Sequence, residues 1–307
     1  MDRLIRRLVT DPEVTDLLIN GDGSVWVERC GSLVRSDEQL PDALAVRRLA
    51  VRLAAGAGRR LDDSMPYADG QLPGGIRFHG VLAPVATDGA HISLRIPRRT
   101  FLDLITIEST GSVSSDQVLE LRQLVAERRS VLISGGTGTG KTTLLAAVLA
   151  EVDARDRLVV VEDVSELNIR HPHVVRLQAR HRNVEGAGEV TLTDLVRQSL
   201  RMRPDRLVVG EVRGPEVVDL LRGFNTGHEG GWATVHANSA HDVMTRLEAL
   251  GSLAGLPGEA IRSQALAAID AVVHLERVDG RRRVREIVHW APRSPRVGAT
   301  PLSAARA

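Results

Sequence analysis

The sequence predicts an α/β protein in which a small α+β domain precedes a larger domain built on a mostly parallel sheet. Short apolar stretches that alternate with turn residues fill the first third of the chain, and continuous apolar stretches separated by amphipathic helices fill the rest. In addition, 307 residues with 43% hydrophobic content exceed what one core commonly fills, because cores stop growing at about 250 to 300 residues. We therefore expect two domains.

The N-terminal α+β domain is expected over residues 1–107. Its short strands, including LLINGDGSVWVERCGSL, surround one helical stretch at 44–57. Residues 108–115, ESTGSVSS, are small and polar, and this composition favours an interdomain linker.

The second domain is expected over residues 116–290. Ser114 or Ser115 caps a first helix that runs to about residue 129, and the buried strand 131–134 follows it. Three helix–strand units come next, with helices at 142–151, 192–202 and 215–222 and strands at 157–162, 206–210 and 232–235. Such continuous apolar strands are typical of a parallel sheet that is covered on both faces.

The chain is expected to end with two helices, a hairpin and a tail. The helices lie near 240–250 and 259–269, and the hairpin pairs AVVHLER with VREIVHW across an Asp-Gly turn. The arginines of 281–285, RRRVR, are more typical of a solvated turn than of a nucleic-acid patch. Residues 291–307 are expected to be a disordered tail.

Composition excludes several classes of protein. The net charge of +1 does not favour nucleic acid or an anionic membrane as a partner of the whole chain. The single cysteine, Cys30, excludes an internal disulfide and a cysteine-rich zinc site, and it fits a reducing cytosol. The basic start of the chain lacks the apolar core of a secretory signal, and no apolar run approaches the roughly 18 residues that span a bilayer. We expect a cytoplasmic protein that reaches a membrane only through a partner.

A glycine-rich loop follows the strand 131–134. Residues 135–142 fit G-x-x-x-x-G-K-[ST] without a mismatch, and they lie between a predicted strand and a predicted helix. Backbone N–H groups of such a loop converge on phosphates, with further help from the N-terminus of the next helix. The predicted nucleotide contacts are Gly135, Gly136, Thr137, Gly138, Thr139, Gly140, Lys141, Thr142 and Thr143.

Lys141 is the one lysine among 40 basic residues. A bias toward arginine explains the excess of arginine but not the position of this lysine. A compact ammonium suits a tight phosphate loop better than the wide fork of arginine does. We expect Lys141 to bridge the β- and γ-phosphates of ATP and the Thr142 hydroxyl to bind Mg²⁺.

Acidic residues end two of the later strands. Glu162 and Asp163 follow RLVVV, and Glu211 follows RLVVG. Because ligands of open α/β sheets bind outside the carboxyl ends of the strands, these carboxylates are expected beside the phosphate loop. Glu211 is the candidate that orients or deprotonates the attacking water.

The stretch TGHEGGWATVHANS completes a set of four motifs. With the phosphate loop, the Glu162-Asp163 pair and VVGEVRG, it resembles the Walker A, aspartate, Walker B and histidine boxes of the secretion ATPases of type II secretion, type IV secretion and type IV pilus systems. Upstream segments such as GRRLDDSMPYADGQLPGG resemble the N-terminal, PAS-like domain of Tad (Flp) pilus assembly ATPases. The resemblance covers about residues 14–290.

This resemblance implies a RecA-like P-loop ATPase domain and a set of site residues. It makes His228 and His236 the histidine box, and Glu162 a catalytic residue and a possible Mg²⁺ ligand. A conventional Walker B strand has an aspartate before Glu211, whereas this chain has Gly210, and Trp232 stands where a smaller residue is more usual.

Arginines are also expected at the nucleotide, because charge that builds on the γ-phosphate must be neutralised. Candidates are Arg95, Arg98, Arg99, Arg201, Arg203 and Arg213. The resemblance favours Arg95 and Arg201, with Arg98 as a further possibility.

The resemblance implies a homohexameric ATPase at the inner face of the cell membrane, which drives pilus assembly or protein secretion through an inner-membrane platform protein. The alternative is a DNA-processing ATPase of a conjugative type IV secretion system. Only seven residues are aromatic and they are scattered, so no base-stacking platform is evident and no nucleic acid is expected. A third interpretation, a nucleotide-sensing scaffold, is disfavoured by the presence of Lys141, Thr142 and Glu211.

Overall fold

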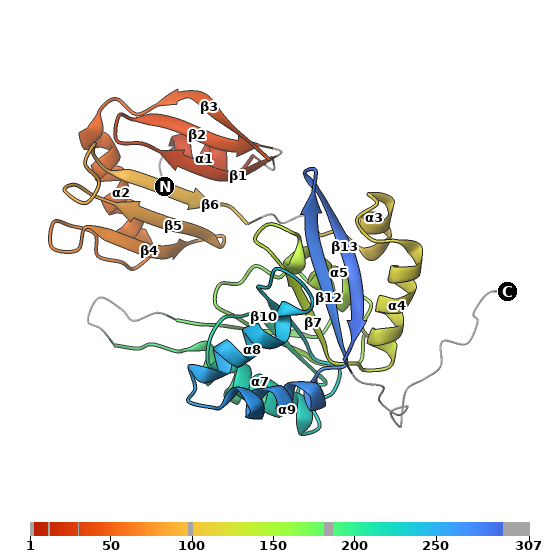
Figure 1. Ribbon diagram of the computed structural model, residues 1–307. Coiled ribbons are helices and arrows are strands. Elements are labelled where there is room, and N and C mark those ends of the chain that lie inside the picture. The colour runs from red at the N-terminus through yellow and green to blue at the C-terminus, as the bar shows by residue number, and fades with distance from the viewer. Residues whose placement is uncertain (1–2, 12, 30, 98–100, 181–186, 291–307) are drawn as a thin grey trace. The chain divides into compact units, whose positions relative to one another are not determined.

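The computed structural model describes residues 1–307 except 1–2, 12, 30, 98–100, 181–186 and 291–307. The expected tail, Cys30, Arg98 and Arg99 therefore lie outside the described residues. The chain forms two compact units: one holds the N-terminal residues up to Arg99, and the other holds Thr100–Arg180 and the residues from Val190 onward (Figure 1). Each unit has its own sheet.

The first unit contains a six-stranded antiparallel sheet in the order β3-β2-β1-β6-β5-β4. Its strands are β1 (Val14–Ile19), β2 (Ser24–Arg29), β3 (Ser32–Gln39), β4 (Tyr67–Leu72), β5 (Ile76–Val81) and β6 (His91–Arg95). Its helices are α1 (Arg3–Val9) and α2 (Ala43–Gly56).

Helix α2 shows how the sequence forms this unit. The carboxylate of Asp42 accepts a hydrogen bond from the backbone N–H of Ala45, which caps the first turn. One stripe of α2, which includes Val46, Leu49 and Leu53, is buried in the core of the unit. The burial of this stripe stabilises the helix against the sheet.

The second unit contains a seven-stranded sheet in the order β13-β12-β7-β11-β10-β8-β9. Neighbouring strands are parallel throughout except for the antiparallel pair β12–β13. The strands are β7 (Val131–Gly135), β8 (Leu158–Glu162), β9 (Val174–Gln178), β10 (Arg206–Val212), β11 (Trp232–Val235), β12 (Ala271–Val278) and β13 (Arg281–His289).

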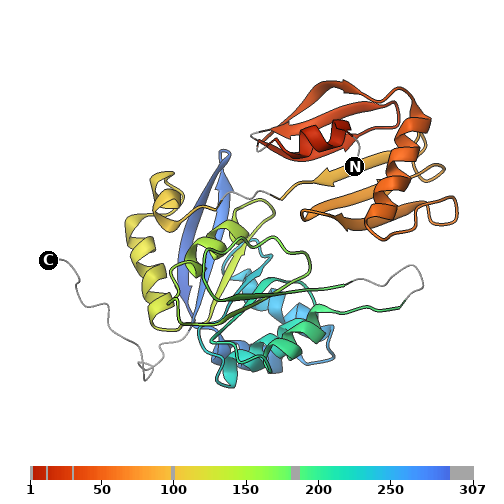
Figure 2. The same ribbon diagram turned by 180° about the vertical axis from the view of Figure 1, so that it is seen from behind.

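Helices cover both faces of this sheet (Figures 1 and 2). They are α3 (Leu104–Ser109), α4 (Ser115–Ala126), α5 (Lys141–Leu149), α6 (Leu192–Ser199), α7 (Glu216–Asn225), α8 (Asp242–Ser252) and α9 (Gly258–Ala268). Successive residues of β7 enter different cores: Val131 and Ile133 pack with α3 to α5, whereas Leu132 packs with α6 to α9. This alternation explains why the central strands are apolar on both faces.

The boundary between the units lies before the predicted linker. Leu104 and Ile107 of α3 and Val113 are buried in the core that α4 and α5 form with the second sheet. The small polar residues between them made the stretch look like a linker, although its few apolar side chains are spaced to reach that core. The predicted cap does occur, since Ser114 and Gln117 form a capping box at the start of α4.

Three elements, α1, α3 and β9, had no counterpart in the sequence prediction. β9 is a partly buried edge strand parallel to β8. Among the described residues, no helix combines the length and the hydrophobicity that crossing a membrane requires.

Candidate functional site

The predicted site motifs lie at the carboxyl edge of four adjacent strands. In the order β7-β11-β10-β8, these strands lead into the phosphate loop, reach His236, contain Glu211 and end at Glu162. Neighbouring parallel strands end at the same side of a sheet, so the sheet topology brings together motifs as far apart in the chain as Gly135 and His236.

The phosphate loop requires glycine at its two ends. Gly135 has a φ of +150°, and a Cβ atom there would lie 2.4 Å from the carbonyl oxygen of Leu275. Gly140, with a φ of +98°, is the N-cap of α5. Backbone N–H groups at the start of α5 are thereby left for an anion.

The Lys141 ammonium folds back onto the loop. Its Nζ donates to the carbonyl oxygens of Gly135 and Gly136 at 2.9 and 2.8 Å. Burial lowers the pKa of this ammonium below its usual value; the nearby Glu211 carboxylate opposes this effect and the Arg213 guanidinium adds to it. Glu211 of β10 and Arg213 of the turn that follows it therefore lie close to the phosphate loop.

Glu211 and Arg213 form an ion pair. Nε of Arg213 donates to Oε2 of Glu211 at 2.8 Å, and Nη1 of Arg213 lies 3.9 Å from Oδ2 of Asp163. The turn after β10 is fixed by the buried Glu216, whose Oε1 accepts from the backbone N–H groups of Arg213 and Gly214. Arg213 thus links the carboxylates that end two neighbouring strands, a role that the sequence analysis did not assign to it.

Glu162 organises the loop that follows β8. Its Oε1 accepts from the backbone N–H groups of Glu166 and Leu167, both at 2.9 Å. Burial raises the pKa of this carboxyl, and the two hydrogen bonds oppose the rise. The side chain also fills the space beside Gly210, where a Cβ atom would lie 2.8 Å from Cγ of Glu162. Glu162 therefore occupies the volume that an aspartate at position 210 would need.

The two predicted histidines lie in different environments. His236 follows β11 and is exposed, whereas His228 is partly buried. Among the described residues, Nδ1 of His228 has no hydrogen-bond partner, although it is buried. Trp232 begins β11 and is 0% exposed, so it is a core residue at the opposite end of the strand from His236.

His274 is a site-edge residue that the sequence analysis missed. It is buried in β12, and its Nδ1 lies 2.9 Å from Oγ of Ser134, immediately before the phosphate loop. Burial lowers the pKa of its imidazole. A histidine within the apolar run AVVHLER was the available signal, because a buried polar group needs a partner.

The structure does not connect the two favoured arginines to the phosphate loop. Arg95 is an exposed residue at the end of β6 in the first unit. Arg201 follows α6, and its Nη1 lies 3.4 Å from the carbonyl oxygen of Arg197. Their predicted catalytic roles therefore depend on the family resemblance.

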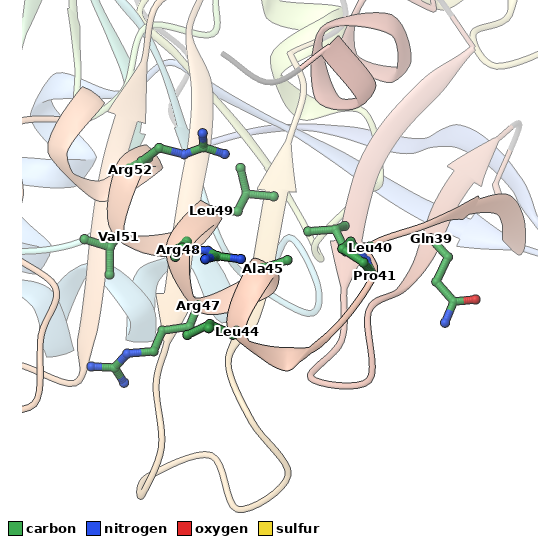
Figure 3. A pocket seen from close by; sticks show the side chains of 10 residues that line it. All are labelled: Gln39, Leu40, Pro41, Leu44, Ala45, Arg47, Arg48, Leu49, Val51 and Arg52. Atoms are coloured by element: carbon green, nitrogen blue, oxygen red, sulfur yellow. The ribbon is translucent and has the colours of Figure 1, made fainter.

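A hollow of about 730 Å³ runs along α2 in the first unit (Figure 3). Leucine, valine and arginine side chains line it, among them Leu44, Val51 and Arg48. Arg47, which also lines it, pairs with Asp63 at 2.7 Å. None of the predicted site residues lines this hollow.

Comparison with known proteins adds a family and relatives. Residues 1–293 match the family described as type II/IV secretion system protein. A putative conjugal transfer protein of Mycobacterium tuberculosis is 50% identical over 306 residues, which cover 97% of this chain and 87% of that protein. The conjugal transfer protein TrbB of Rhizobium radiobacter is 33% identical over 305 residues, which cover 94% of this chain and 90% of that protein. The VirB11 ATPase of the Brucella suis type IV secretion system is similar in structure, with a TM-score of 0.51, 27% identity, and coverage of 93% of this chain and 92% of that chain.

Proposed function

Since this chain belongs to the type II/IV secretion system protein family, we propose that it is an ATP-hydrolysing motor that drives pilus assembly or protein secretion through an inner-membrane platform protein. One observation supports this most: the loop Gly135–Thr143 joins β7 to α5, and the Glu211 carboxylate lies close enough to the Lys141 ammonium to oppose the lowering of its pKa by burial. The family resemblance supports the finer features, namely a RecA-like ATPase domain and a homohexameric ring.

In this proposal, ATP binds with its phosphates at the N-terminus of α5. Lys141 exchanges the carbonyl oxygens of Gly135 and Gly136, which it now contacts, for phosphate oxygens. The glycines give the loop its shape, and the backbone N–H groups at the start of α5 donate to the remaining phosphate oxygens. His228 and His236 stand at the two ends of the segment that contains β11, where they respond to the γ-phosphate.

Mg²⁺ fits the donors that the loop offers. This ion usually keeps several waters and binds one or two protein groups together with phosphate oxygens, so the Thr142 hydroxyl at the start of α5 suffices as a ligand. The described residues contain no cluster of three or more histidine, cysteine or carboxylate side chains that would hold a metal. Because Glu162 uses Oε1 for two backbone N–H groups, we assign it mainly to positioning the loop after β8. Bound Mg²⁺ would neutralise phosphate charge.

Glu211 is the proposed catalytic carboxylate. It orients a water molecule toward the γ-phosphorus and takes up a proton from it as the bond to ADP breaks. Arg213 holds this carboxylate beside the loop through their ion pair. Arg95 and Arg201 are proposed to neutralise charge at the nucleotide, by analogy with the arginines of the family.

The test compares ATP turnover and nucleotide binding in the parent protein and in Lys141→Ala. Hydrogen bonds to charged groups contribute about 1.5–3 kcal/mol, so the variant should bind ATP roughly 10- to 100-fold more weakly and lose turnover. Unchanged binding by calorimetry would show that the phosphate-loop assignment is wrong. A parent protein that binds ATP and never hydrolyses it would favour a nucleotide-sensing scaffold instead.

A DNA-processing ATPase of a conjugative system is the second candidate, because two relatives are described as conjugal transfer proteins. The seven aromatic residues of the chain offer little base stacking. Stimulation of turnover by single-stranded DNA at moderate salt would favour this candidate. Turnover that is insensitive to DNA would favour the secretion motor.

A further inference from the structure

The arginines of the segment 281–285 divide between the two faces of β13. Arg283 and Arg285 both pair with Glu276 of β12, and the distance from Nη1 of Arg285 to Oε2 of Glu276 is 2.8 Å. Successive side chains of a strand point to opposite faces. Arg282 therefore lies on the face opposite to Arg283. It is exposed, as are Arg281, Arg283 and Arg285, which agrees with the expected solvated turn.

The face that carries Arg282 packs against the phosphate loop. Leu275 and Val284 are paired across the hairpin on this face, and both are buried in the core that includes α5. Cδ2 of Leu275 lies 3.9 Å, and Cδ of Arg282 only 3.4 Å, from the position that a Cβ atom of Gly140 would take. The stem of Arg282 thus lies along the residue that caps α5.

The position of this contact matters because Gly140 precedes the helix N-terminus that would receive the phosphates. The geometry points to Arg282 as a nucleotide-binding residue, which donates from its guanidinium to the phosphates bound at α5. This inference rests on the proposed function, and it adds a second cation to the loop from the C-terminal hairpin. Arginine suits the task, because its planar fork can donate two hydrogen bonds to one phosphate group.

A contact at the cap of α5 predicts a particular kinetic signature. ADP and ATP share the phosphates nearest to this helix end, so the contact stabilises both nucleotides and the transition state alike. Interactions of this uniform kind change KM and Kd while kcat stays nearly constant. Lys141 and Glu211, by contrast, are expected to change turnover itself.

The experiment measures ADP, a non-hydrolysable ATP analogue and AMP by calorimetry with the full chain. The variants are Arg282→Ala, Arg282→Lys and the control Arg281→Ala, which removes the neighbouring arginine on the other face of β13. Arg282→Ala should bind ADP and the ATP analogue about 10-fold more weakly, the lower end of the range for a hydrogen bond to a charged group. Its kcat at saturating ATP should stay within about twofold of the parent value. Arg282→Lys should be intermediate, and Arg281→Ala should match the parent.

Three outcomes would overturn the inference. The first is parental nucleotide affinity in Arg282→Ala, and the second is an equal loss of affinity in Arg281→Ala. The third is a loss of affinity in Arg282→Ala that is the same for AMP as for ADP. This third result would place the contact on the base, the ribose or the α-phosphate alone. A parent protein that binds no nucleotide would contradict the proposed function. If the parent hydrolyses ATP and Arg282→Ala binds nucleotides with parental affinity, only this inference is contradicted.

Discussion

Gly210→Ala tests why a glycine stands where a conventional Walker B strand has an aspartate. A Cβ atom at position 210 would lie 2.8 Å from Cγ and 3.4 Å from Oε1 of Glu162. Carbon atoms pack at about 3.5–4.0 Å, so roughly 1 Å of overlap must be relieved. Glu162 cannot move aside cheaply, because it is 4% exposed and its Oε1 accepts two backbone N–H bonds. We expect the substitution to lower the free energy of unfolding by about 1–3 kcal/mol.

Urea unfolding measures this loss directly. The matched control is Gly258→Ala, where the nearest atom to the new Cβ would be 3.7 Å away, and its stability should stay within about 1 kcal/mol of the parent value. In a Glu162→Ala background the cost of Gly210→Ala should shrink by at least about 1 kcal/mol, because the two side chains no longer compete for one space. An equal cost in both backgrounds, or a cost no larger than that of Gly258→Ala, would refute this explanation of the glycine.

Two further predictions concern the pH dependence of stability and the action of Arg95 across a subunit boundary of the proposed hexamer. Burial lowers the pKa of His274 from its usual 6.5, so the unfolded chain takes up a proton that the folded chain does not, and stability is full above that value and falls as pH decreases below it. His274→Gln should therefore lose less stability than the parent when urea unfolding at about pH 5.5 is compared with about pH 7.5, and equal losses would contradict the assignment. Arg95→Ala should lower turnover by about 10³- to 10⁵-fold if this arginine supplies charge to phosphoryl transfer. Mixing it with Lys141→Ala should restore activity if Arg95 acts across a subunit boundary, and a mixture as inactive as its components would exclude that arrangement.

Much of the fold could be predicted because the central strands are apolar on both faces. β7 and β11 are continuous apolar runs, and their predicted bounds lie within one residue of those observed. Three elements escaped because their signals are weak. Helix α1 is short and rich in arginine, α3 has only six residues and runs into the polar segment, and β9 is only partly buried. The domain boundary was misplaced because three buried apolar residues decide where α3 and the following turn pack, whereas local composition reflects their more numerous polar neighbours.

The strand–loop–helix position of the phosphate loop could be predicted from one local motif, whereas contacts that join distant strands could not. The spacing of the phosphate loop fixed Gly140 and Lys141 without knowledge of the sheet. The pairing of Arg213 with Glu211, by contrast, depends on the turn after β10, and the contact of His274 with Ser134 depends on β12 lying beside β7. Neither contact leaves a periodic pattern in the sequence.

The fate of ATP bound to Glu211→Gln decides whether this carboxylate activates the attacking water. This change keeps the size and shape of the side chain and removes the carboxylate that accepts a proton from water. We predict that the variant binds ATP with parental affinity and retains it uncleaved, with turnover lowered by at least about 100-fold, the range expected for loss of a general base. Hydrolysis within a few-fold of the parent rate would contradict the assignment of Glu211 and, with it, the catalytic site proposed at the edge of β10.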